Sequence, residues 1–263
     1  MESSAALRRG NNITTNIQTE SVMKFEEIMR YSRQLHTQWV LLKDDIAMDD
    51  GSAKRLASIG KIISMKKGIS NRRLLEQYLR RICSKYALTK RIDRLCGESF
   101  DNKNTDHKRL LENLWKNLKP KETFPGVPNE RWKELGFQGS DPASDFRSVG
   151  IFGLRQLVAF TGTDSGQRAY EEAQYGPYWY SFAIVSLNVS NHICMLLKSR
   201  QFNRLLYSGD LNEEEGLTLL DELTCVLFLL FHKDWMDAKP LNLFAFSKVF
   251  AGSCIRFNKL FVW

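Results

Sequence analysis

The stretch Tyr178-Trp-Tyr-Ser-Phe-Ala-Ile-Val-Ser-Leu-Asn-Val-Ser-Asn-His-Ile-Cys-Met-Leu196 decides the fold class. Its apolar residues recur every three or four positions, at 178, 182, 185, 189, 193 and 196, which is the spacing of one face of an α-helix. The opposite face carries Ala183, Ile184 and Leu187, so the helix is apolar on nearly every side. Because such a helix is normally buried, we predict that it forms the centre of a helical bundle.

Helical spacing continues upstream of this segment. It predicts a helix over residues 21–48, capped by Ser21 and interrupted in its apolar face only by Ser32, with Asp49-Asp50-Gly51 ending it. A second helix is predicted over residues 74–86, and a third opens at Asp106 and runs to Leu118. Three of the six prolines then fall within residues 119–128, which predicts a loop.

Downstream, Asn212 and Glu215 have the spacing of a capping box at the start of a further helix. Pro240 separates that helix from a last one, predicted over Leu243–Phe250. Strand-like alternation is absent from the sequence, so the predicted fold is all-α, a compact multi-helix bundle. We predict a disordered lead (1–20), a basic N-terminal helical region (21–104) and a second helical domain (105–263).

Composition and cysteine usage bound the class of protein. The 43% apolar and 26% charged residues are typical of a globular chain. Residues 1–21 lack the apolar core of a secretory signal, and the longest apolar run, Cys225–Phe231, is far shorter than the roughly 20 residues of a membrane span. The five cysteines form no C-x-x-C and no zinc spacing with the histidines. We therefore expect a soluble cytoplasmic protein with free, buried thiols, including Cys225 and Cys254, and no metal.

The net charge of +8 is concentrated in one part of the chain. Residues 54–94 hold thirteen Lys and Arg against Glu76 and Asp93, so the rest of the chain is acidic by about three charges. One interpretation is a solvated helix face, and the other is attraction to an anionic membrane or an acidic protein. Nucleic acid is not predicted as a partner, because no nucleic-acid-binding motif accompanies the charge.

Motifs of self-contained enzymes are missing. The sequence has no phosphate-binding loop and no zinc-protease motif, and Gly162-Thr-Asp-Ser-Gly166 has the wrong order for a nucleophile elbow. We therefore expect no complete active site within this chain and no cofactor of its own.

One segment differs in composition from the rest: Trp132-Lys-Glu-Leu-Gly-Phe-Gln-Gly-Ser-Asp-Pro-Ala-Ser-Asp-Phe-Arg-Ser-Val-Gly-Ile-Phe-Gly153. Asp141-Pro142 favours a helix start, with Asp141 as the cap, and Ser144-Asp145 offers a second start. Either start places Arg147 near a helix N-terminus, where a cation is unfavourable, so we expect Asp141 or Asp145 to oppose its charge.

The residues of this segment follow the pattern W-x-x-x-G-F-Q-x-x-D-P-x-[ST]-D-F-R, which resembles the signature of the ELMO-domain proteins. The similarity is to the single-domain ELMOD branch, whose members act as GTPase-activating proteins for Arf and Arf-like small GTPases. It covers roughly residues 105–263. The resemblance implies that Arg147 is the catalytic arginine, supplied in trans, while GTP and Mg²⁺ belong to the partner GTPase. An arginine in that position neutralises charge on the transferring phosphoryl group.

The remaining motif residues are candidates for partner binding or for positioning the loop: Trp132, Gly136, Phe137, Gln138, Asp141, Pro142, Asp145 and Phe146. The aromatic residues favour core anchors over partner contacts, and Gln138 favours bracing the loop over positioning water. Ser148 departs from the family, which often has glycine there, and would strain the turn if the position needs a positive φ.

Three functions remain open from the sequence. The first is the GTPase-activating protein just described. The second is a non-catalytic ELMO-type scaffold or adaptor that binds a GTPase or an exchange factor at membranes; separately, the structural alternative for Arg147 itself is an ion pair with Asp141 or Asp145 that holds the loop. The third is a membrane adaptor that uses residues 54–94 for peripheral contact with anionic lipid.

Overall fold

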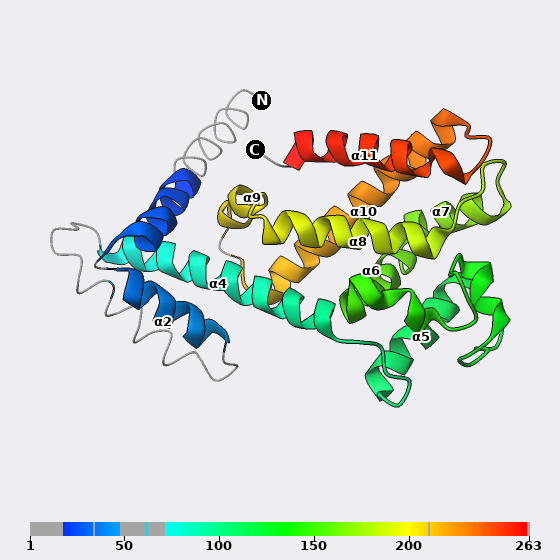
Figure 1. The fold of residues 1–263 in the computed structure, drawn as a ribbon, viewed down its shortest axis with the longest axis horizontal. Coiled ribbons are helices and arrows are strands. Elements are labelled where there is room, and N and C mark those ends of the chain that lie inside the picture. The colour runs from blue at the N-terminus through cyan, green and yellow to red at the C-terminus, as the bar shows by residue number, and fades with distance from the viewer. Residues whose placement is uncertain (1–17, 34, 48–61, 63–71, 210, 262–263) are drawn as a thin grey trace, which may run out of the picture. The chain divides into compact units, whose positions relative to one another are not determined.

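The computed structural model describes residues 18–33, 35–47, 62, 72–209 and 211–261 (Figure 1). Every regular element within these ranges is a helix and none is a strand, so the predicted all-α fold is confirmed. The elements are a helix over 18–31, α2 (His36–Ala47), α4 (Arg72–Gly97), α5 (Thr105–Leu118), η1 (Glu130–Leu135), η2 (Pro142–Ser144), η3 (Phe146–Ser148), α6 (Gly150–Thr161), α7 (Asp164–Tyr175), α8 (Phe182–Lys198), α9 (Asn203–Tyr207), α10 (Glu213–Ala238), η4 (Leu243–Ala245) and α11 (Phe246–Phe261).

The chain divides into two compact units. Unit 1 is formed by the described residues up to Arg91 together with Arg200–Leu217, and unit 2 by Ile92–Ser199 and Thr218 onward. The divisions fall inside α4 and α10, so each of these long helices contributes to both units. The sequence-based domain limits at residues 20 and 104 stay predictions.

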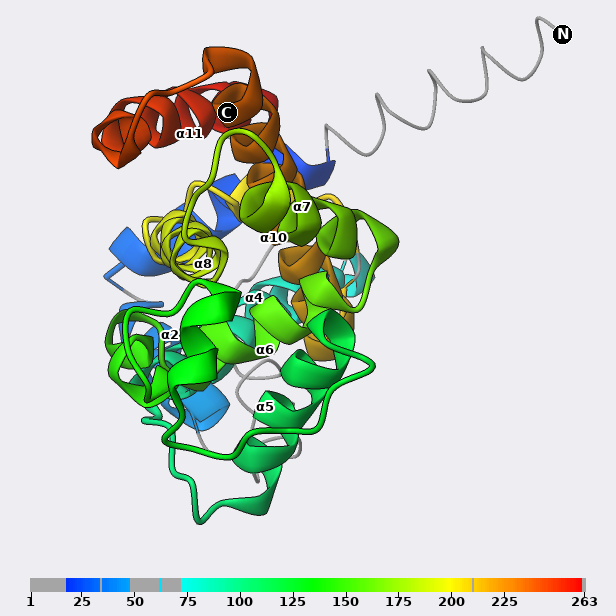
Figure 2. The same ribbon diagram turned by 90° about the vertical axis from the view of Figure 1, so that its right-hand side faces the viewer.

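In unit 2, α6 lies between α5 and α8 in both views of the ribbon (Figures 1 and 2). Nine of its twelve residues are buried, because its sequence GIFGLRQLVAFT is apolar on almost every side. α6 therefore shares the central position that the sequence predicts for α8. Most of α8 is buried, but the Met195 side chain is 55% exposed.

The start of α8 also differs from the prediction. The helix begins at Phe182, and Tyr178–Tyr180 precede it without helical structure. Tyr180 is nonetheless fully buried, and its hydroxyl lies 2.8 Å from Nδ1 of His232. The apolar spacing therefore marks buried positions correctly within α8, whereas Tyr178 before the helix is only half-buried and the buried Tyr180 lies outside the predicted spacing.

The apolar face predicted for a single helix over residues 21–48 belongs to two helices. The helix over 18–31 ends just before Ser32, the one residue that broke the apolar pattern, and α2 begins at His36. Ser21 lies inside the first helix and does not cap it. Both helices bury their apolar residues, among them Phe25 and Trp39, in one core with Leu79 of α4. Asp49-Asp50-Gly51 lies outside the described residues.

The predicted capping box is confirmed. The Asn212 backbone N–H donates to Oε2 of Glu215 (2.8 Å), and the Glu215 N–H donates to Oδ1 of Asn212 (3.0 Å). α5 begins one residue before Asp106, with Asn104 as its cap. The last helix was predicted too short, because α11 continues to Phe261. Residues 119–128 contain no helix, as expected from their prolines. None of the described helices has the length and apolarity to cross a bilayer.

Candidate functional site

The segment from Trp132 to Gly153 is anchored by a chain of aromatic side chains. Trp132 is fully buried, donates from Nε1 to the Gly126 carbonyl (2.9 Å), and packs edge-on against Trp115 and Phe137 at 5.4 and 5.9 Å between centroids. Phe137 in turn packs edge-on against buried Phe146 at 5.8 Å. Edge-to-face ring contacts of this kind stabilise the fold beyond the free energy gained by burying the rings. Trp132, Phe137 and Phe146 are therefore core anchors of the loop.

Two glycines let the segment approach neighbouring backbone closely. Gly136 has φ +87°, and a Cβ there would lie 2.4 Å from the Phe182 nitrogen at the start of α8. Gly150 has φ +51°, and a Cβ would lie 2.5–2.6 Å from the carbonyl oxygens of Leu95, Cys96 and Glu98. Only glycine fits either position, since other residues would need both a strained φ and a displaced backbone.

The two aspartates of the motif are committed to backbone N–H groups. Asp141 caps η2, with Oδ1 accepting from the Ala143 N–H (2.9 Å), and Pro142 follows at the first helical position, as predicted. Asp145 accepts from the Gln138 N–H at Oδ2 (2.8 Å), which ties the start of the loop to η3. The carboxylates therefore hold the loop, and neither forms an ion pair with Arg147.

The Arg147 side chain is exposed on η3, and the fold holds it through its Nε atom. Its Nε donates to the Ser144 carbonyl (2.7 Å), and its Nη atoms have no hydrogen-bond partner among the described residues. The prediction that Arg147 forms an ion pair with Asp141 or Asp145 is wrong, because the described structure contains neither pair. The reason is local, because both carboxylates accept hydrogen bonds from backbone N–H groups of the loop instead. By contrast, Arg131 pairs with both Glu122 and Glu134.

The Arg147 side chain borders a shallow pocket of about 260 Å³. Its lining comes from the motif and from one face of α8: Gln138, Ser144, Asp145, Arg147, Ser148, Ile184, Leu187 and Asn188. Gln138 is exposed, and only its backbone N–H is engaged in the loop. Sequence reasoning missed the α8 residues, although their i, i+3, i+4 spacing places them on one face.

Ser148 does not carry the strain that the family pattern suggested. In the part of the chain that the structure describes, the non-glycine residues with positive φ are Arg200 and Lys239. The positive φ in this turn falls two residues later, at Gly150. Serine at position 148 is therefore compatible with the conformation that presents Arg147.

The cysteines are free, as predicted, but not all are buried. Cys96 and Cys225 are half-buried. The Sγ atoms of Cys96 and Cys194 lie 3.2 Å apart, a neighbourhood that sequence spacing could not reveal. Burial raises the pKa of Cys225 and of Cys254 to about 11. A hydrogen bond from Cys194, with the nearby charge of Lys198, lowers the pKa of Cys96. The described residues include no cluster of three or more His, Cys, Asp or Glu suited to a metal.

The segment that carries Arg147 lies within a region that is similar to a known protein family. The model of the ELMO/CED-12 family matches residues 90–250, more than half of the chain. The chain belongs to the ELMO/CED-12 family. Its matched region includes the whole of the Trp132–Gly153 segment, so the resemblance of that segment to the ELMO-domain signature is confirmed.

Individual relatives extend the similarity beyond the matched family region. ELMO domain-containing protein 1 of Bos taurus is 29% identical over 248 residues, covering 86% of this chain and 74% of the relative. ELMO domain-containing protein 2 of Bos taurus is 32% identical over 153 residues, or 56% of this chain and 51% of the relative. ELMO domain-containing protein B of Dictyostelium discoideum is 30% identical over 164 residues, or 62% and 56%. No solved structure matches this chain.

Proposed function

We propose that this ELMO-family chain is a GTPase-activating protein for an Arf or Arf-like small GTPase and supplies Arg147 in trans. One observation carries the proposal: Arg147 is exposed and anchored through Nε, and its Nη donors have no partner among the described residues. An arginine with a structural role would instead be expected to use those donors within the fold.

The rest of the loop supports such a role by restricting where Arg147 can move. The Ser144 carbonyl fixes the guanidinium at its base, and Asp145 joins η3 to the loop at Gln138. Buried Phe146, directly before Arg147, attaches the turn to the aromatic core. A rigidly presented arginine loses little conformational freedom when it reaches a developing charge, so more of its interaction is available to the transition state.

The chemistry required of this chain is limited. The partner GTPase holds the nucleotide and Mg²⁺, and its slow step is limited by charge on the transferring phosphoryl group. The planar guanidinium of Arg147 offers a permanent charge and two parallel donors at that position. An arginine supplied in this way is worth on the order of 10³–10⁵ in rate.

The test is single-turnover hydrolysis by a panel of GTP-loaded Arf-family GTPases, with and without this chain. We expect stimulation of at least one of them, and we expect Arg147→Ala to remove it while GTPase binding and melting temperature stay unchanged. Arg168→Ala is a matched control, since Arg168 is exposed on α7 with a single long contact (3.5 Å) to Ser165. Binding without stimulation by the wild type would favour the scaffold alternative, and full stimulation by Arg147→Ala would exclude the catalytic role.

We further propose that the chain works in the cytoplasm, in peripheral contact with anionic membrane. The support is the basic stretch 54–94, of which the described part presents Arg73, Lys90 and Arg94 as exposed side chains. Other basic residues of α4 serve the fold: Arg81 donates to the Tyr207 carbonyl, and Lys85 is only 4% exposed. Co-sedimentation with phosphatidylserine vesicles should weaken as salt is added, because such attraction is screened over about 8–10 Å. Absence of binding at low salt would remove this proposal.

A further inference from the structure

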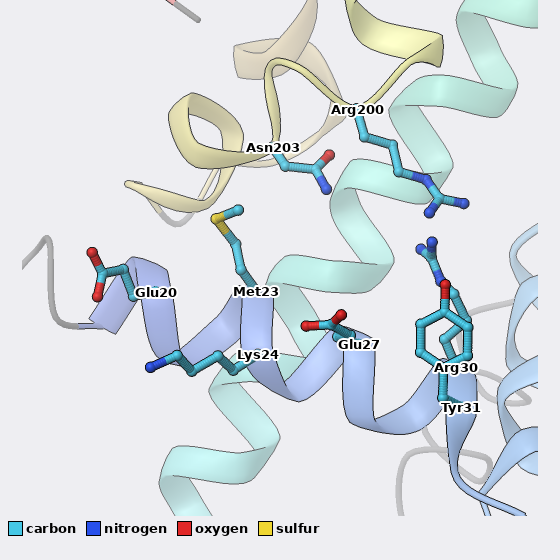
Figure 3. Close-up of a pocket in the computed structure, with 8 residues that line it drawn as sticks. All are labelled: Glu20, Met23, Lys24, Glu27, Arg30, Tyr31, Arg200 and Asn203. Carbon is cyan, nitrogen blue, oxygen red and sulfur yellow. The ribbon is translucent and has the colours of Figure 1, made fainter. Parts of the chain in front are cut away.

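Unit 1 contains a pocket of about 340 Å³ that plays no part in the proposed GTPase activation (Figure 3). The helix over residues 18–31 supplies most of its wall. Arg200, in the turn before α9, and Asn203, the first residue of α9, supply the rest. The lining residues are Glu20, Met23, Lys24, Glu27, Arg30, Tyr31, Arg200 and Asn203. Three are cationic, two are anionic and one is an amide, so the pocket is suited to a polar ligand.

Arg30 is positioned in this pocket by a buried hydrogen-bond network. Its Nη2 donates to Oε1 of Glu26 (2.8 Å) and to the Tyr86 hydroxyl (3.1 Å). Glu26 is 3% exposed and also accepts from the hydroxyls of Tyr86 and Tyr207, both at 2.8 Å. Burial and the charge of Glu26 raise the pKa of both tyrosines, so both remain donors. The guanidinium is thus fixed, while Nε and Nη1 have no partner among the described residues.

Arg200 approaches the same space from the opposite side. Figure 3 shows the guanidinium groups of Arg30 and Arg200 pointing toward one another. Arg200 has φ +66°, an uncommon conformation for a residue with a side chain, and its side chain is exposed with no hydrogen-bond partner in the described structure. Two like charges that converge repel each other unless an anion lies between them. The arrangement is therefore suited to an anion held by both arginines.

Asn203 gives the pocket a second polar requirement. It is only 8% exposed, and its Nδ2 donates to Oε2 of Glu26 (3.4 Å), which orients the amide. Its Oδ1 is buried and accepts no hydrogen bond. A buried acceptor without a donor is uncommon in folded proteins and calls for a specific explanation. The Glu27 carboxylate, which forms no ion pair in the described structure, also lines this pocket (Figure 3).

We propose that this pocket binds a phosphorylated polyol. The phosphate lies between Arg30 and Arg200, which donate charge-assisted hydrogen bonds to its oxygens. Neighbouring hydroxyls donate to Oδ1 of Asn203 and to the Glu27 carboxylate. Inorganic phosphate satisfies the arginines, but its hydroxyls are attached to the same phosphorus atom that the arginines hold, and its charge is repelled by the Glu27 carboxylate. A neutral polyol leaves the positive charges of the two guanidinium groups without a compensating anion. The same chemistry occurs in soluble inositol or sugar phosphates and in inositol-lipid headgroups.

The binding test uses isothermal titration of the full chain with inositol monophosphate, inorganic phosphate and myo-inositol. We expect inositol monophosphate to bind more tightly than the other two. Arg200→Ala should weaken its binding by about tenfold or more, which corresponds to the loss of one charge-assisted interaction. Arg33→Ala is the matched control: Arg33 is exposed near Arg30, lies outside the pocket, and carries the same charge.

A second variant makes the test sharper. Glu27→Gln removes the carboxylate at an exposed position. It should therefore raise the affinity for inorganic phosphate, while the affinity for inositol monophosphate should stay equal or fall. Vesicles with phosphatidylinositol monophosphate, compared with phosphatidylserine vesicles of equal surface charge, separate the two sources. Preference for the inositol lipid alone supports a membrane headgroup, and binding of the soluble probe supports a free phosphorylated polyol. Equal losses with Arg200→Ala and Arg33→Ala, equal affinity for inorganic phosphate, or no binding to either form would overturn the proposal.

Discussion

Arg147 in unit 2 and Arg30 in unit 1 are presented by opposite means. Arg147 stands on a short turn whose support is hydrophobic: Phe146 beside it is buried among aromatic rings, and one backbone carbonyl holds its Nε. Arg30 is supported by a polar network, in which buried Glu26 and the Tyr86 hydroxyl hold Nη2. Arg147 uses one nitrogen in a hydrogen bond to the fold and forms no ion pair in the described structure, whereas Arg30 forms an ion pair with Glu26.

The difference has consequences for stability and for function. An exposed arginine held by a neutral carbonyl adds little to the free energy of unfolding, so its removal should leave the stability of the fold nearly unchanged. A buried carboxylate whose arginine is lost is left without its charge partner and is costly. Under the two proposals, unit 2 separates the functional group from the scaffold, while in unit 1 the same arginine serves both. The following predictions test that separation.

The largest effect is expected at Arg147. Replacement by lysine keeps the charge but loses the planar donor fork, so Arg147→Lys should lower the stimulated rate of GTP hydrolysis by about 10³ or more. The melting temperature should not change, because the side chain makes one hydrogen bond to a carbonyl and no ion pair. Single-turnover hydrolysis and differential scanning calorimetry on the same preparation measure both quantities. A variant that keeps the full rate would show that charge alone suffices.

The largest loss of stability is expected at Glu26. Glu26→Ala leaves Arg30, Tyr86 and Tyr207 without their common acceptor, and the loss of one partner from a buried ion pair costs about 3–5 kcal/mol. Urea denaturation of the wild type and the variant gives this value. Glu76→Ala is a suitable control, since its pair with Arg80 on α4 is exposed and should be worth less than about 1 kcal/mol. A loss below 1 kcal/mol at Glu26 would show that unit 1 does not depend on the network.

The two regions also differ in how far the sequence predicts them. The loop around Arg147 is contiguous, so Trp132, Asp141 and Phe146 could be assigned from local spacing and cap chemistry. Asp141 caps a helix, as expected, and the aromatic residues are anchors. The ion pair predicted for Arg147 failed because a carboxylate nearby in sequence can be satisfied by backbone N–H groups instead. That choice depends on the three-dimensional path of the loop.

The network in unit 1 could not be predicted, because its members are far apart in the sequence. Tyr86 lies 60 residues from Glu26, and Tyr207 lies 181 residues from it. Each residue alone follows an ordinary helical pattern, and a glutamate on an apolar helix face gives no sign of its partners. The helix break near Ser32 was visible in the sequence, but one polar residue does not distinguish a break from an imperfect apolar face.

The next effect in size is expected at Gly150. A side chain there requires a positive φ and meets three backbone carbonyls, so Gly150→Ala should cost about 2–3 kcal/mol. It should also displace η3, and therefore lower stimulation of hydrolysis together with stability, unlike Arg147→Lys. Gly252→Ala on α11 is the control, because no atom lies near its Cβ; there we expect a gain of about 0.5–1 kcal/mol. Chemical denaturation measures both. An unchanged stability in Gly150→Ala would mean that the turn can move away from α4.

The smallest effect is the coupling between Arg147 and Asp145. These residues are two positions apart, yet Asp145 accepts from the Gln138 N–H and Arg147 donates to Ser144. Asp145→Ala should cost about 1 kcal/mol through the lost hydrogen bond, and Arg147→Ala should stay within about 0.5 kcal/mol of the wild type. In a double-mutant cycle, the two losses should add to within about 0.5 kcal/mol. The same cycle on Glu26 and Arg30 should give a coupling well above about 1 kcal/mol, since the Glu26 carboxylate of their ion pair is buried. Similar coupling energies in both cycles would contradict the comparison, because Arg147 would then be part of an ion pair and its donors would not be available to a partner.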